Sequence, residues 1–121
     1  MGLLRTLFGV LLGAKPSGNR RGPFDGAVAA ATEGFTFKTN VDVRSFCPEY
    51  AGRSYSCSYA VYDSAGNVRQ VIDLIPQNGN RDDSYKAMVE ACSKRKIKVV
   101  TFYTHLPNEY EYVVNKIRAA L

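Results

Sequence analysis

The segment SYAVYDSAGNVRQVIDLI, residues 58–75, decides the fold because it reads as two β-strands joined by a tight turn. Residues 58–63 and 68–75 are rich in β-branched and aromatic side chains, which favour strands. Between them, Asp63 is a turn former and Gly66 suits a positive φ angle. We therefore predict a β-hairpin at the centre of the chain.

The hairpin register determines which residue lies opposite Asp73. Pairing through a four-residue turn puts Ser58 opposite Asp73, whereas a turn with a glycine bulge puts Cys57 there. An acidic residue in the apolar run of residues 71–75 is costly unless it is paired. Arg69, on the same face of the strand, is one candidate partner for Asp73. The alternative is that Asp73 occupies a vestigial metal position.

Before the hairpin, the sequence predicts one helix and one strand. Residues 25–33, DGAVAAATE, favour a short helix, with Asp25 as the N-cap and Gly34 as the stop. Residues 35–43 alternate apolar and polar side chains, which is typical of a half-buried strand. The folded domain is expected to begin near Phe24.

After the hairpin, the sequence predicts a helix, a strand and a second helix. Asp82 or Asp83 caps the first helix. Residues 97–103, IKVVTFY, carry apolar side chains on both faces, which predicts a central strand covered on each side. Asn108 with Glu111 resembles a capping box at the start of the last helix. The order α-β-β-β-α-β-α predicts an α/β (α+β) domain, with a mixed sheet of about four strands and helices on both faces.

The first 23 residues differ in composition from the rest of the chain. Residues 1–14, MGLLRTLFGVLLGA, are too short to span a membrane, which needs about 20 residues. As a helix they would be amphipathic, and we predict that they bind a membrane surface, a protein partner or the domain itself. Residues 15–23, KPSGNRRGP, read as a linker to the domain at residues 24–121.

Composition sets broad limits on function. The 121 residues carry a net charge of +5, which suits nucleic acid or an anionic membrane surface as a partner. Cys47, Cys57 and Cys92 do not form a close metal-ligand pair and His105 is the single histidine, so a structural zinc site would need a sparse mixture of ligands. We expect reduced thiols in a cytoplasmic protein, and a Cys47–Cys57 disulfide is the alternative for an exported chain. The sequence contains no phosphate-binding glycine loop or nucleophile elbow, so no small-molecule substrate is expected.

The order of elements over residues 24–121 resembles the core of the PD-(D/E)XK, or restriction-endonuclease-like, superfamily. The hairpin is most similar to that of small bacterial nuclease-like domains. This resemblance implies two carboxylates and a lysine on the hairpin, where the carboxylates hold a divalent cation and the lysine helps to activate water. These positions fall on Ser58, Asp73 and Ile75, so the resemblance implies a degenerate active site with Asp73 as its vestigial residue.

The first hypothesis is therefore a non-catalytic nuclease-like domain in a bacterial or phage cytoplasm, with no cofactor, that binds nucleic acid or a protein. The candidate phosphate contacts are Arg69, Arg81, Lys94, Arg95 and Lys96. An alternative hypothesis is an adaptor, peripheral to the membrane or docked on a partner through residues 1–14. A further alternative is a divergent nuclease that uses Asp73 and Mg²⁺.

Overall fold

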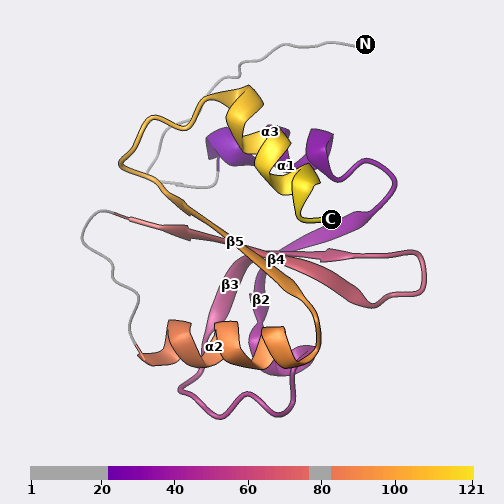
Figure 1. Cartoon of the computed structure of the whole chain (residues 1–121), viewed down its shortest axis with the longest axis vertical. Helices are drawn as coiled ribbons and strands as arrows, with labels where there is room; N and C mark the ends of the chain where they lie inside the picture. Colours follow the sequence, from indigo (N-terminus) through magenta and orange to yellow (C-terminus); the bar gives the residue numbers. More distant parts are fainter. Residues whose placement is uncertain (1–21, 77–82) are drawn as a thin grey trace.

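The computed structural model describes residues 22–76 and 83–121 (Figure 1). Its elements are α1 (Gly22–Ala31), β2 (Thr36–Asp42), the 3-10 helix η1 (Val43–Ser45), β3 (Ser56–Tyr62), β4 (Val68–Ile75), α2 (Asp83–Lys94), β5 (Lys98–Tyr103) and α3 (Tyr110–Ala119). This order confirms the predicted α+β fold class. The predicted amphipathic segment at residues 1–14 lies outside the described residues, and so does the linker up to residue 21.

The four strands form one mixed sheet in the order β2-β3-β4-β5. β2 and β3 are antiparallel, as are β3 and β4, whereas β4 and β5 are parallel. The prediction that residues 97–103 form a central strand is wrong, because β5 lies at an edge of the sheet. Its side chains are apolar on both sides because helices cover both faces of the sheet even at this edge. Within the described sheet, β4 and β3 are the inner strands.

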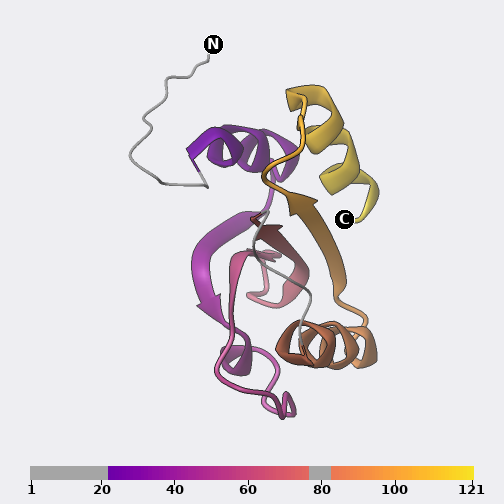
Figure 2. The same cartoon turned by 90° about the vertical axis from the view of Figure 1, so that its left-hand side faces the viewer.

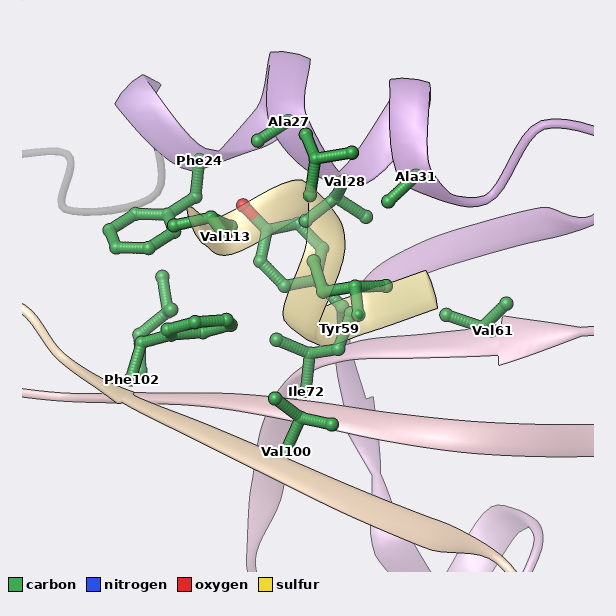
Figure 3. Packing of buried hydrophobic residues seen from close by; sticks show 13 residues of the cluster. Phe24, Ala27, Val28, Ala31, Tyr59, Val61, Ile72, Val100, Phe102 and Val113 are labelled. Atoms are coloured by element: carbon green, nitrogen blue, oxygen red, sulfur yellow. The ribbon is translucent and has the colours of Figure 1, made fainter. Parts of the chain in front are cut away.

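Helices lie on both faces of the sheet, as predicted: α1 and α3 cover one face and α2 covers the other (Figures 1 and 2). Each face has its own hydrophobic core. The core under α1 and α3 is built around Phe24, Val28, Tyr59, Ile72, Phe102 and Ile117 (Figure 3). The core under α2 includes Val43, Cys57, Val71, Ile75, Met88 and Cys92. All three cysteines are buried free thiols.

The hairpin combines the two alternatives left open by the sequence. The Asp63 carboxylate accepts hydrogen bonds from the amides of Ala65 and Asn67, and Gly66 takes a φ of 87°, as expected for this turn. Tyr62 pairs with Val68, but the register then shifts, and further along Tyr59 pairs with Ile72. The shift restores the pairing expected for a four-residue turn. Ser58 therefore lies across from Asp73, one residue beyond the Tyr59–Ile72 pair.

A left-handed residue in β2 changes which face the strand presents. Asn40 has a φ of 52°. Phe37 packs on the α1 and α3 core, whereas Val41, which regular alternation would place on the same face, packs on the α2 core. On the partner strand β3, Tyr59 and Cys57 divide between the two cores in the same way. This change of face lets the start of β3 join the α2 side of the sheet.

Two predicted helix caps are wrong. α1 begins at Gly22, so Asp25 lies in its first turn, where its Oδ1 accepts a 2.5 Å hydrogen bond from the Tyr59 hydroxyl. Asn108 does not cap α3, because α3 begins at Tyr110. The Asn108 side chain instead donates to the carbonyls of Tyr103 and Leu106 and closes the turn after β5. In residues 22–76 and 83–121, no helix has the length and hydrophobicity needed to cross a bilayer.

Candidate functional site

Asp73 is a buried acid that is satisfied by neutral protein groups. Its side chain lies on β4, and the residue is only 4% exposed. The Tyr55 hydroxyl donates to Oδ2, while the amide and hydroxyl of Ser58 both donate to Oδ1 at 3.3 Å. The Ser58 hydroxyl also accepts a 3.1 Å hydrogen bond from the Leu74 amide. Ser58 therefore ties the acid to the backbone of the neighbouring strand.

The Asp73 carboxyl is shifted toward its neutral form. Burial raises its pKa, and the hydrogen bonds from Tyr55 and Ser58 offset part of this effect. The predicted pairing with Arg69 is wrong, because Arg69 Nη1 lies 3.8 Å from Asp63 Oδ2 at the hairpin turn. The register shift next to Arg69 removes it from the regular alternation that would have aligned it with Asp73.

The other two positions implied by the resemblance do not provide metal chemistry. Ser58 is a hydrogen-bond partner of Asp73. Ile75 is 6% exposed and packs in the α2 core, so nothing at this position can act as the lysine. Across residues 22–76 and 83–121, no three His, Cys, Asp or Glu side chains come together in a way that could hold a metal ion.

Two tyrosines and one threonine on the same side of the sheet as Asp73 were not predicted as site residues. They are Tyr55, Tyr85 and Thr101. Tyr55 precedes β3, and Thr101 lies opposite Asp73 in the parallel register with β5. The Thr101 hydroxyl is 2.7 Å from the hydroxyl of Tyr85 on α2. Nothing in the sequence singled out Tyr55 or Tyr85 among eight tyrosines, because their role depends on tertiary contacts.

Most of the predicted phosphate contacts face an acid. Besides the Arg69 pair, Lys94 lies 3.7 Å from Glu90, and Arg95 Nε lies 2.6 Å from Glu49. Lys96 has a φ of 61° in the turn between α2 and β5. Arg81 lies outside the described residues. The acid beside each of these three residues reduces the positive charge that a phosphate would meet there.

A groove of about 490 Å³ runs along the edge of β5. It is lined by Tyr85, Lys98, Val99, Val100, Thr101, Tyr103, Lys116, Ala119 and Ala120. Two lysines and no acidic residue are among these. The Lys116 ammonium lies over the Phe102 ring, 5.4 Å from its centroid, and donates a 3.3 Å hydrogen bond to the Tyr112 hydroxyl. The groove is therefore a cationic and aromatic surface beside β5, which is an edge strand of the described sheet.

The positive charge of the chain is concentrated at its start. Residues 1–21 contain four lysines and arginines and no acidic residue, whereas residues 22–121 contain twelve basic and eleven acidic residues. The domain alone is thus close to neutral. A general electrostatic attraction to polyanions would come mainly from the first 21 residues.

Comparison with known proteins gives little further guidance. No family model matches the chain, and no solved structure matches it. Over 71 residues it is 32% identical to Protein FAM83D-B and to Protein FAM83D-A, both from Xenopus laevis. These matches cover 59% of this chain but only 12% of either relative. The likeness is therefore confined to one segment of much longer proteins.

Proposed function

We propose that this chain is a nuclease-like domain of the PD-(D/E)XK type that does not cleave nucleic acid and acts as an interaction module. The observation that carries this proposal is the state of Asp73. Both of its carboxylate oxygens accept hydrogen bonds from Tyr55 and Ser58. The order of helices and strands is the one that the resemblance implies, and this supports the same conclusion.

The chemistry of metal-dependent hydrolysis explains why this arrangement argues against cleavage. A hydrated divalent cation needs several oxygen ligands, and usually more than one carboxylate. Asp73 already accepts three of the roughly four hydrogen bonds that a carboxylate can take. Burial also raises its pKa, and this disfavours the charged form that a metal ion binds. With Ser58 and Ile75 at the other two positions, a metal site would lack both its second acid and its base.

A protein partner suits the surface better than nucleic acid does. Arg69, Lys94 and Arg95 each face an acidic residue. Residues 22–121 are nearly neutral overall, so the domain lacks the broad positive field that favours nucleic-acid binding. The groove along β5 is a cationic surface with two lysines and no acid among its lining residues.

A cleavage assay tests the absence of activity. The whole chain is incubated with single- and double-stranded DNA and with RNA, in the presence of Mg²⁺ or Mn²⁺, and compared with an Asp73→Asn variant. Asn keeps the shape of the side chain and removes its charge, so the variant is a matched control. We expect no cleavage by either protein. Metal-dependent cleavage that disappears in Asp73→Asn would overturn the proposal.

The concentration of positive charge in residues 1–21 favours a second function, that of an adaptor recruited to an anionic surface. Four basic residues beside a predicted amphipathic helix form a common membrane-targeting combination. Sedimentation of the whole chain with anionic phosphatidylserine vesicles, and with neutral vesicles as the control, tests this candidate. We expect binding to the anionic vesicles alone and its loss when residues 1–15 are deleted. Equal binding by the shortened chain would exclude this function.

A further inference from the structure

The two edges of the sheet differ in how readily they could accept another strand. At one edge, β2 is distorted at Asn40, which has a φ of 52°, and this distortion discourages strand pairing. At the other edge, β5 keeps one register with β4 from Lys98 to Tyr103 without a shift. Among the described strands β5 pairs with β4 alone, so the backbone groups on its outer side form an undistorted row.

The residues that line the groove differ between its two sides, with lysines on one side and tyrosine and threonine on the other. Lys98 has the same alternation as Val100 and Phe102, which pack under α1 and α3, so its side chain lies on the α3 side of the sheet. Lys116 of α3 lines the same groove. Neither lysine forms an ion pair within residues 22–76 and 83–121. The α2 side of the groove is lined by Tyr85, Thr101 and Tyr103.

We propose that the outer edge of β5 binds an extended, acidic segment of a partner protein as an added strand. This inference rests on the proposed role of the domain as an interaction module and names its partner class. Backbone hydrogen bonds to the edge hold such a segment, and alternate side chains provide specificity. The side chains of the partner segment that point to the α3 side meet Lys98 and Lys116, so we expect Asp or Glu at those positions. Those on the α2 side meet Thr101 and Tyr103, so they are apolar or aromatic. β5 is six residues long, which sets the length of the recognised segment.

A synthetic peptide provides the direct test. The probe is a fluorescein-labelled hexapeptide of alternating Glu and Val, titrated with the whole chain and followed by fluorescence anisotropy. The controls are a peptide with the same composition in two blocks, three Glu followed by three Val, and an alternating peptide with N-methylated backbone amides. We expect the alternating peptide to bind and both controls to bind at least tenfold more weakly. Equal binding of all three peptides would show charge attraction without strand addition and would overturn the inference.

Charge reversal locates the binding surface. The double variant Lys98→Glu, Lys116→Glu should weaken binding of the alternating peptide by about tenfold or more, because it replaces two attractive contacts with repulsive ones. Lys38→Glu on β2 is the matched control and should leave binding unchanged. A loss of affinity with Lys38→Glu, or no loss with the double variant, would contradict placement at β5.

Two other occupants of this edge are distinguished in the same experiments. If single-stranded DNA displaces the peptide and binds more tightly with the same lysine dependence, the groove serves nucleic acid and the inference is overturned. If sedimentation shows a dimer that the Lys98→Glu substitution dissociates, the edge pairs with a second copy and the inference also fails. The cleavage assay is run on the same protein sample. Failure of peptide binding without cleavage removes only the strand-addition inference, whereas cleavage removes the proposed function itself.

Discussion

Removal of the Tyr55 hydroxyl would test whether Asp73 is a buried, partly ionised acid. In the Tyr55→Phe variant, Oδ2 of Asp73 loses the hydroxyl that donates to it, while the ring and its packing remain. A hydrogen bond to a charged group contributes about 1.5–3 kcal/mol, and one between neutral groups about 0.5–1.5 kcal/mol. We expect the variant to lose about 2 kcal/mol of unfolding free energy at neutral pH. For a domain of this size, such a loss lowers the melting temperature by about 8 °C or more.

The dependence of this loss on pH follows from the raised pKa of Asp73. A carboxyl with a raised pKa in the folded state binds more protons when folded than when unfolded, so its contribution to stability falls as pH rises through that pKa. The Tyr55 hydrogen bond lowers the pKa, so removing it extends the range over which stability falls. The difference between the native chain and Tyr55→Phe should therefore be smaller at about pH 3.5 than at pH 7.

A double-mutant cycle isolates the interaction between Tyr55 and Asp73. The free energies of unfolding in urea are measured by circular dichroism for the native chain, Tyr55→Phe, Asp73→Asn and the double variant. In the Asp73→Asn background, Tyr55→Phe should cost only about 1 kcal/mol, because the acceptor is neutral. Tyr112→Phe, at a residue that is 50% exposed, is the control and should change stability by less than about 0.5 kcal/mol. Equal costs of Tyr55→Phe in both backgrounds would refute the assignment of an ionisable partner.

Three further predictions concern the rest of the fold. Gly66→Ala should destabilise the domain by about 1–2 kcal/mol, because the φ of Gly66 is 87°. Gly26→Ala should stabilise it by about 0.5–1 kcal/mol, because a Cβ added to this residue of α1 meets nothing within 4 Å. Thermal unfolding measures both changes, and the same sign for the two variants would be inconsistent with this reasoning. Gln70 is fully buried and donates to a carbonyl near the end of α3, but its Oε1 has no partner within the described residues. In urea unfolding, Gln70→Met should therefore change stability by no more than about 1 kcal/mol, whereas Gln70→Glu should cost about 3 kcal/mol or more. Similar costs for both variants would contradict this account. Burial raises the pKa of both Cys57 and Cys92 to about 12, which reduces the fraction of reactive thiolate about a thousandfold. Iodoacetamide at pH 8 should therefore leave both thiols unmodified until the protein is denatured. Rapid labelling of the native protein, detected by mass spectrometry, would disprove this.

Local patterns were sufficient to predict the order of the elements and the character of the hairpin. Alternation with a period of two identified β2, β-branched and aromatic residues identified the two hairpin arms, and periodic apolar positions identified α2 and α3. Asp63 and Gly66 predicted their turn because the required backbone conformation depends on those residues alone. The ends of elements were less well predicted. Asn108, for example, caps the turn after β5 because the Tyr103 carbonyl is brought near it by folding.

The neighbours of each residue were beyond what these patterns can specify. Apolar side chains on both faces of β5 indicated coverage by helices, but this feature is the same for an inner strand and an edge strand. Cys57, which pairs with Val41 just beyond the left-handed Asn40, lies on the α2 face, and Tyr55 packs on the same side, where it meets Asp73. Neither consequence follows from strand alternation, which assumes that every residue continues the same twist.

The sequence by itself therefore determined the composition of the hairpin site: an acid at Asp73, a serine at Ser58 and an apolar residue at Ile75. Tertiary structure alone decided that Tyr55 rather than Arg69 satisfies the acid, and that β5 presents an open, lysine-lined edge. The physical reason is the range of the interactions. Turns and helical or strand periodicity depend on residues a few positions apart, whereas the partner of a buried charge and the order of strands depend on which distant segments pack together.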